Sequence, residues 1–174
     1  MSKALLVIDL QNDYFQGGYF PLWNTDNTLD NIEAAISLAT AQGIPVVHVQ
    51  HLADPEIGSA SFLTMGTEGA AIHPRILAAA PDAAIVVKQY ADSFYRTNLD
   101  TVLSDLGVTE LLVCGMMTQN CVTHTAISTS AEKYQVSILA DCCTTVDAMI
   151  HNIALRAVST RLAVLPASTA FGMS

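Results

Sequence analysis

The chain has 174 residues and a formal net charge of −9 at pH 7, with only seven Lys and Arg. Such a charge disfavours binding to nucleic acid and to anionic membrane surfaces. Hydrophobic residues make up 51% of the sequence and charged residues 13%, which excludes an intrinsically disordered chain. We therefore expect a single domain over residues 1–174 that buries a large core.

The apolar runs of the sequence bear on the cellular location of the protein. None is long enough to span a bilayer, and the opening MSKALLVIDLQND has an Asp where a signal peptide needs a cleavage site. We expect a cytoplasmic protein in which the four cysteines are reduced thiols. Because the chain is this apolar, part of its surface must be apolar too. Such surface is usually buried between subunits, so we also expect a homo-oligomer, either a dimer or a tetramer.

Short apolar runs alternate with stretches of helical periodicity along the chain. Strands are predicted at residues 4–9, 44–50, 83–88, 110–115, 136–140 and 161–167. Helices are predicted at residues 28–43, 98–106, 119–133 and 146–160. Near-continuous apolar strands separated by helices are typical of a parallel sheet covered on both faces. The predicted fold is a three-layer α/β/α, Rossmann-like domain with a central, mostly parallel, six-stranded sheet.

Reactive side chains fall at the predicted carboxyl ends of the strands, where open α/β sheets bind ligands. Asp9 ends the first strand, Lys88 ends the third, and Cys121 follows the fourth at the start of a helix. These residues are distant in sequence but map to one edge of one sheet. The Gly- and Ser-rich segment 51–73 is a further candidate, because a long loop in a compact domain is more often functional than idle.

Each of these residues has a chemical role and a plainer alternative. Asp9 either takes a proton from the thiol and returns it to a leaving group, or merely caps the loop that follows. Lys88 either holds Asp9 ionised and lowers the pKa of the thiol, or extends to solvent as lysines at strand ends commonly do. Three such groups at one sheet edge favour the catalytic interpretation.

Cys121 lies where a thiol is expected to be reactive rather than only buried. It stands in the first turn of the predicted helix, for which Thr118 is the expected N-cap. Free backbone N–H groups and the helix dipole favour a thiolate there, and the same N–H groups can bind an oxyanion. Of the other cysteines, Cys114 is expected in the core, and the adjacent Cys142 and Cys143 in a tight turn.

The five histidines are weaker candidates. His48 and His51 are three residues apart on a strand, so their side chains point to opposite faces and do not make a metal pair. We expect His51 to lie past the strand end and to line the pocket. His124 follows Cys121 by one turn and gives a Cys–His alternative, which we rank second. His73 and His151 are expected to be structural.

Three segments carry a resemblance to a known family. VIDLQNDY, the DSFYRTNLD that follows the strand of Lys88, and CGMMTQNCVTHTA resemble the isochorismatase-like cysteine hydrolases, which include nicotinamidases and related amidases. The resemblance covers nearly the whole chain and extends to GTEGAAIHP and to DCCTTVD. It implies the isochorismatase-like hydrolase fold, with Asp9, Lys88 and Cys121 as a catalytic triad.

The resemblance implies further site residues. The oxyanion hole corresponds to the backbone N–H groups of Met117 and Cys121, beside a cis peptide bond between Met116 and Met117. The residues that the resemblance implies as lining the pocket or bracing the triad are Gln11, Tyr14, Ser93 and Phe94; His51 is expected in the pocket from its place past the strand end.

Departures from the resemblance concern metal ions. Metal-binding nicotinamidases carry an Asp-x-His after the second strand and a further His in the following loop. Here His51 stands near that Asp, Ala53 near the first His, and Phe62 near the second. The resemblance therefore implies no bound metal, and we expect no cofactor.

The sequence predicts a metal-independent hydrolase of a small carboxamide or a related C–N bond, which works through a thioester on Cys121. The substrate is expected to be a small molecule. Two alternatives remain open: a hydrolase of an isochorismate-type vinyl ether, which needs no nucleophilic thiol, and a non-catalytic binding protein that retains the fold.

Overall fold

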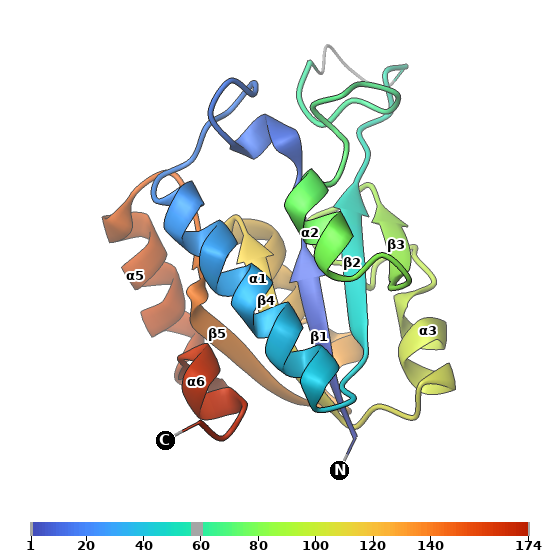
Figure 1. Ribbon diagram of the computed structural model, residues 1–174, viewed down its shortest axis with the longest axis vertical. Coiled ribbons are helices and arrows are strands. Elements are labelled where there is room, and N and C mark those ends of the chain that lie inside the picture. Colours follow the sequence, from blue (N-terminus) through green and yellow to red (C-terminus); the bar gives the residue numbers. More distant parts are fainter. Residues whose placement is uncertain (1, 57–60, 174) are drawn as a thin grey trace.

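The structure is a computed structural model that describes residues 2–56 and 61–173. Its centre is a six-stranded sheet in the order β3-β2-β1-β4-β5-β6, and every pairing is parallel (Figure 1). The strands are β1 (Lys3–Ile8), β2 (Val46–His51), β3 (Ala84–Lys88), β4 (Glu110–Met116), β5 (Gln135–Thr144) and β6 (Ala163–Leu165). The sequence order of the strands changes direction between β1 and β4, so a crevice is expected at their carboxyl ends.

Helices cover both faces of the sheet and complete the predicted three-layer α/β/α fold. In Figure 1, α1, α2 and α6 lie in front of the sheet, and α4 lies behind it, in contact with α5. The α-helices are α1 (Thr25–Ala41), α2 (Pro74–Ala79), α3 (Leu99–Asp105), α4 (Thr123–Ala126), α5 (Ala148–Val158) and α6 (Ala167–Ala170). Short single turns are η1 (Asn12–Tyr14), η2 (Thr118–Val122) and η3 (Thr129–Ala131). Within the described ranges, no helix combines the length and the apolarity needed to cross a membrane.

The apolar runs of the sequence become the buried strands. In β1, residues 4–8 are all buried, because β2 and β4 flank the strand and helices cover both its faces. The apolar stripe of α1 packs on the sheet through Leu29, Ile32, Ala35, Ile36 and Ala39. Periodicity in the sequence therefore located both the core strands and the face that α1 buries.

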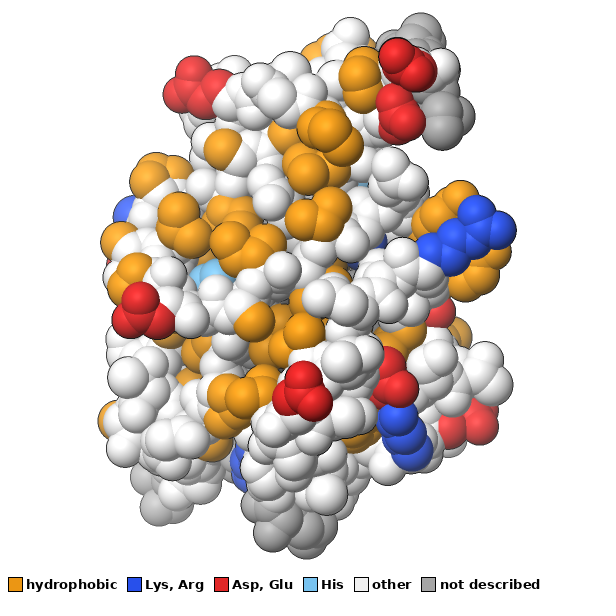
Figure 2. Space-filling model, turned by 90° about the vertical axis from the view of Figure 1, so that its right-hand side faces the viewer, with side chains coloured by type: hydrophobic (Ala, Val, Ile, Leu, Met, Phe, Trp, Pro, Cys, Tyr) orange, Lys and Arg blue, Asp and Glu red, His pale blue; other side chains and the backbone are white. Residues whose placement is uncertain are grey.

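The edge strand β3 is less covered than the central strands. Ile85 is 46% and Val87 is 45% exposed. Figure 2 shows that hydrophobic side chains gather on the side of the molecule where β3 lies. An uncovered apolar edge is the type of surface at which proteins associate. Association between copies of this chain stays a prediction.

The prediction of one continuous helix over 119–133 is wrong, because the structure has three short helical segments there. The chain makes one π-helical turn at η2, one short α-helix at α4 and a 3₁₀ turn at η3. Ser128 starts this last turn, because its hydroxyl accepts from the amide of Ser130 and donates to Asp92 Oδ2 at 2.7 Å. A serine that bonds its neighbouring backbone in this way competes with a continuing helix.

Two further sequence expectations are corrected. Thr118 is not an N-cap: its hydroxyl bonds Nδ1 of His151 at 2.8 Å, and Met117 precedes the helical turn. Cys142 and Cys143 do not fill a turn but lie within β5, where both are buried. Periodicity did not reveal these outcomes because each depends on neighbours distant in sequence.

Gly115 brings β4 unusually close to β1. It has φ of +124°, and a Cβ at this position would overlap the carbonyl oxygen of Ile8. The β4–β5 pairing also shifts register between Val113 and Gly115. A glycine at such an irregularity lets two backbones approach where a side chain would separate them. This approach sets the position of the loop that follows β4.

Candidate active site

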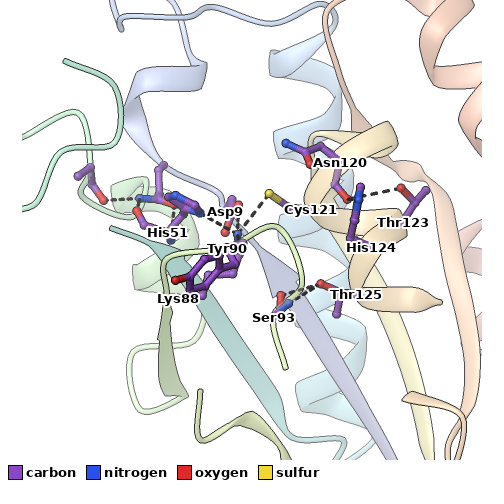
Figure 3. Close-up of polar contacts among 12 residues, drawn as sticks. Asp9, His51, Lys88, Tyr90, Ser93, Asn120, Cys121, Thr123, His124 and Thr125 are labelled. Carbon is purple, nitrogen blue, oxygen red and sulfur yellow. Dashed lines mark hydrogen bonds and ion pairs between the residues drawn. The ribbon is translucent and has the colours of Figure 1, made fainter. Parts of the chain in front are cut away.

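The three residues predicted to form a catalytic site meet at the carboxyl ends of the strands (Figure 3). Nζ of Lys88, the last residue of β3, lies 2.9 Å from Oδ2 of Asp9 and 3.2 Å from Sγ of Cys121. Asp9, Lys88 and Cys121 are 0%, 1% and 4% exposed. Three elements therefore bring together a buried ion pair and a buried thiol.

Asp9 directly follows β1 and has a left-handed backbone, with φ of +55°. This conformation is uncommon for residues other than glycine and often occurs at functional sites. The amide of Asp9 donates to the carbonyl of Val49 at 3.0 Å, which fixes the residue beside β2. Apart from the ion pair with Lys88, its carboxylate accepts no hydrogen bond from the described residues. A carboxylate oxygen lies within 4.8 Å of Sγ of Cys121, close enough for the carboxylate to raise the pKa of the thiol.

Cys121 lies in the π-helical turn η2, which follows β4 directly. A cis peptide bond joins Met116 to Met117, as the sequence resemblance implied. The amides of Asn120 and Val122 both donate to the carbonyl of Met117, which closes the turn. Within residues 2–56 and 61–173, the amide of Met117 has no acceptor, and the amide of Cys121 has none outside its own turn.

Burial and charge act in opposite directions on the thiol. Burial raises the pKa of Cys121, the Asp9 carboxylate raises it further, and Lys88 lowers it by less. Burial and the Asp9 carboxylate therefore oppose the thiolate that the helix position and Lys88 were expected to favour. For Lys88, burial lowers the pKa, but Asp9 and Cys121 more than offset it, so the pKa is raised and the side chain stays an ammonium.

Residue His51 ends β2 and lies against Lys88. Its Nδ1 is 3.0 Å from Nζ of Lys88. Both main-chain groups of His51 are held by the Gln11 side chain: Nε2 donates to the carbonyl at 2.7 Å, and Oε1 accepts from the amide at 2.9 Å. Gln11 is fully buried, so it braces the site rather than lining a pocket.

The remaining predicted residues surround the triad. Tyr14 is 2% exposed and stacks edge-on against Phe62, with ring centroids 5.2 Å apart. Burial raises its pKa, and the charge on Asp9 raises it further, which places the phenol near the ion pair. Ser93 is fully buried and bonds the hydroxyl of Thr125 at 2.8 Å, so it ties its loop to α4. Phe94 is 7% exposed and follows in that loop.

A model of the protein family described as "Isochorismatase domain" matches residues 3–170. The chain belongs to the isochorismatase family. The uncharacterized isochorismatase family protein YddQ of Bacillus subtilis is 37% identical, over 87% of this chain and 83% of that protein. The nicotinamidase of Escherichia coli is 27% identical, over 81% of this chain and 82% of that protein. A crystal structure described as an isochorismatase hydrolase from Oleispira antarctica has a TM-score of 0.87 at 33% identity and covers 98% of this chain and 96% of that one.

The cysteine of this isochorismatase-family chain does not pair with His124. Nδ1 of His124 lies 2.8 Å from the carbonyl oxygen of Asn120, and the side chain is exposed (Figure 3). The imidazole is thus turned along its own helix, and the Cys–His alternative has no support in the geometry. His73 and His151 have structural contacts as expected: His73 caps α2, and His151 bonds Thr118.

The positions that hold metal ions in metal-binding nicotinamidases do not fit a metal in this member of the isochorismatase family. Ala53 offers no ligand side chain, and the ligand atoms of Asp9, His51 and Cys121, although within 4.8 Å of one another, surround a cation already. Nζ of Lys88 lies 2.9, 3.0 and 3.2 Å from an atom of each. A divalent ion in their midst would face this buried ammonium at close range.

Asp13 is a residue of the site region that sequence reasoning missed. Its Oδ2 accepts from the amide of Leu63 at 2.7 Å, and its Oδ1 accepts from the amide of Tyr19 at 3.2 Å. Gly69 packs so closely against this carboxylate that a Cβ would overlap it. Asp13 therefore joins the loop after β1 to the loop after β2. The only available signal was a second acidic residue close behind Asp9.

Proposed function

We propose that this isochorismatase-family hydrolase cleaves a small carboxamide, or a related C–N bond, through a thioester on Cys121 and without a metal ion. The observation that carries the proposal is the buried ammonium of Lys88, which touches both the Asp9 carboxylate and the Cys121 sulfur. This arrangement joins a base and a nucleophile through one fixed charge.

The first half of the reaction forms the thioester. Asp9 takes the proton from Sγ of Cys121, and the sulfur attacks the carbonyl carbon of the amide. The carbonyl oxygen becomes an oxyanion, which the amides of Met117 and Cys121 stabilise by hydrogen bonds. Protonated Asp9 then gives its proton to the nitrogen, the C–N bond breaks, and the amine or ammonia leaves.

The second half returns the site to its resting state. Asp9 takes a proton from a water molecule, whose oxygen attacks the thioester carbon. The C–S bond breaks, the acid is released, and the proton on Asp9 returns to Sγ. Lys88 keeps its charge throughout, so it stabilises whichever of Asp9 and Cys121 is anionic.

Two observations favour a C–N bond over a vinyl ether. An oxygen of the Asp9 carboxylate lies within 4.8 Å of Sγ, which suits transfer of the thiol proton and thus covalent catalysis. The relative from Escherichia coli is named a nicotinamidase, an amide-cleaving hydrolase. A vinyl ether hydrolase needs no such nucleophile.

The test is hydrolysis of a panel of nicotinamide, aliphatic amides, ureido compounds and a lactam, with and without EDTA. We expect turnover of at least one compound that survives EDTA, is lost in Cys121→Ala and persists in Cys142→Ala, since Cys142 is buried in β5 away from the triad. An active Cys121→Ala protein contradicts the nucleophile, and loss of activity with EDTA contradicts metal independence.

Alkylation by iodoacetamide tests the non-catalytic alternative. Because Lys88 lowers the pKa of Cys121, this thiol should be alkylated faster than Cys114, Cys142 and Cys143, whose pKa values are raised by burial with no lysine among the causes. Equal and slow labelling of all four thiols would instead identify a binding protein that retains the fold.

A further inference from the structure

The ammonium of Lys88 has more acceptors than it has protons. Four atoms lie within hydrogen-bonding distance of Nζ: Oδ2 of Asp9 at 2.9 Å, Nδ1 of His51 at 3.0 Å, the carbonyl oxygen of Tyr90 at 3.0 Å and Sγ of Cys121 at 3.2 Å. An ammonium carries three protons. Three N–H groups are thus shared among four acceptors, and the strongest acceptors determine where the N–H groups of Lys88 point.

These acceptors fall into two chemical kinds. Asp9 and Cys121 exchange a proton in the proposed reaction, so their charges change from step to step. His51 and the carbonyl of Tyr90 take no part in this exchange and stay neutral. Of the four acceptors of Lys88, two thus stay neutral throughout the proposed reaction, while the charges of Asp9 and Cys121 change.

Strand pairing and the side chain of Gln11 fix the backbone of His51. His51 and Lys88 are paired neighbours in the register between β2 and β3. Gln11, from the loop after β1, bonds both main-chain groups of His51 and also donates to the carbonyl of Ala70 at 2.7 Å. In Figure 3 the side chain of His51 lies beside that of Lys88, and Nδ1 is 3.0 Å from Nζ. The backbone of His51 is therefore fixed on the strand beside Lys88, and the contact of Nδ1 with Nζ places the ring against the ammonium.

The tautomer of His51 follows from its surroundings. Burial lowers the pKa of His51, and the positive charge of Lys88 lowers it further, while Asp9 opposes them by less. The ring is therefore neutral. Because Lys88 donates, Nδ1 is the acceptor and the ring proton is on Nε2.

We propose that His51 is a positioning residue, which holds the ammonium of Lys88 in place by accepting one of its hydrogen bonds and so keeps another directed at Sγ of Cys121. This inference rests on the proposed function and deepens it. It reassigns His51, which the sequence placed among the substrate-binding residues. The imidazole serves the protein's own cation here and not a metal ion.

Loss of the acceptor has a defined consequence. Without His51, the three protons of the buried ammonium have only the Asp9 carboxylate, the carbonyl of Tyr90 and Sγ of Cys121 as acceptors. Nothing then holds the ammonium on the side of β2, and it shifts towards Asp9, the strongest remaining acceptor. The contact with Sγ lengthens, so the thiolate loses stabilisation. Turnover and alkylation of Cys121 then fall together.

The experiment compares two substitutions at this position. His51→Phe keeps a planar ring without an acceptor, and His51→Asn places a carbonyl oxygen where Nδ1 was. The control, His124→Phe, removes an exposed histidine that does not touch Lys88. The rate of iodoacetamide labelling of Cys121 is measured against pH in each protein, together with kcat and KM on the amide substrate and the melting temperature.

We expect His51→Phe to lower kcat and the labelling rate near neutral pH by about ten- to hundredfold, to move the labelling profile to higher pH, and to change KM little. His51→Asn should restore most of the labelling rate, and His124→Phe should match the wild type. A folded His51→Phe protein with an unchanged labelling profile overturns the inference. A raised KM with unchanged kcat and profile overturns it too, because it assigns His51 to the substrate.

Failure of the proposed function has a different signature. If Cys121 of the wild-type protein is not labelled faster than the other thiols, the proposed function fails before any variant is compared. If wild-type labelling is fast and the His51 variants share it, only the role of His51 is wrong.

Discussion

The ion pair between Asp9 and Lys88 is completely buried: Oδ2 and Nζ are 2.9 Å apart, and neither side chain has exposed surface. Removing two charges from water is costly, and the attraction between them repays this cost only while both are present. Asp9 and Lys88 therefore act in the proposed reaction and also affect the stability of the fold.

Lys88→Met should strongly destabilise the protein, because it leaves the Asp9 carboxylate buried without a partner. We expect a loss of about 3–5 kcal/mol in the free energy of unfolding. The double variant Asp9→Asn, Lys88→Met removes both charges and should be more stable than Lys88→Met alone. Urea denaturation of the wild type, both single variants and the double variant measures this. A double variant no more stable than Lys88→Met would contradict an unpaired charge as the cause.

The two charges of the pair should act oppositely on the reactivity of Cys121. The Asp9 carboxylate raises the pKa of the thiol and Lys88 lowers it. Asp9→Asn should therefore shift alkylation of Cys121 to lower pH, yet abolish amide turnover, because the base is lost. Lys88→Met should shift alkylation to higher pH and slow turnover. Labelling followed by mass spectrometry over a range of pH measures both, and a shift in the same direction for the two variants would refute these roles.

Gly115→Ala should disrupt the contact between β1 and β4. The residue has φ of +124°, and the added Cβ overlaps the carbonyl oxygen of Ile8. We expect a loss of roughly 3 kcal/mol in the free energy of unfolding. Gly107→Ala is the matched control, because Gly107 has φ of +63° and open space around the added Cβ. It should cost about 1 kcal/mol, and equal losses in the two variants would assign the effect to backbone conformation alone.

Stability should fall as the pH drops below about 6.5, the pKa of histidine in an unfolded chain. Burial lowers the pKa of His48, which the bond to the carbonyl of Ala80 only partly offsets. The unfolded chain therefore binds more protons in this range, so the stability that neutral His48 contributes above it is lost as the pH falls through the lowered pKa.

Denaturation at pH 7.5 and pH 5.5 checks this prediction. His48→Gln keeps a donor for the carbonyl of Ala80 but cannot take up a proton, so it should depend less on pH than the wild type does. The exposed His124→Gln should retain the wild-type dependence. A wild-type slope in His48→Gln would locate the effect elsewhere, for example at His51 or His151, whose pKa values burial also lowers.

Three expectations from the sequence stay predictions: association between copies, location in the cytoplasm and the chemical class of the substrate. The loop at 51–73 is described except for residues 57–60, and its contact with Asp13 shows how its described part is held beside the site.

The sequence by itself determined the sheet and the residues that meet at its edge. Apolar runs such as that of β1 must be buried, so their order along the chain predicted parallel strands, and Asp9 and Lys88 followed from the strand ends. Local periodicity is sufficient for such features because burial of a strand depends on its own residues.

Only the tertiary structure decided how these residues interact. The role of Thr118 depends on His151, the ammonium of Lys88 has His51 as one of its acceptors, and the pKa of Cys121 depends on the balance between burial, Asp9 and Lys88. Each outcome is a competition between groups far apart in sequence and a few ångströms apart in space. Distances and burial set the strength of such electrostatic contacts, and neither can be read from residue order.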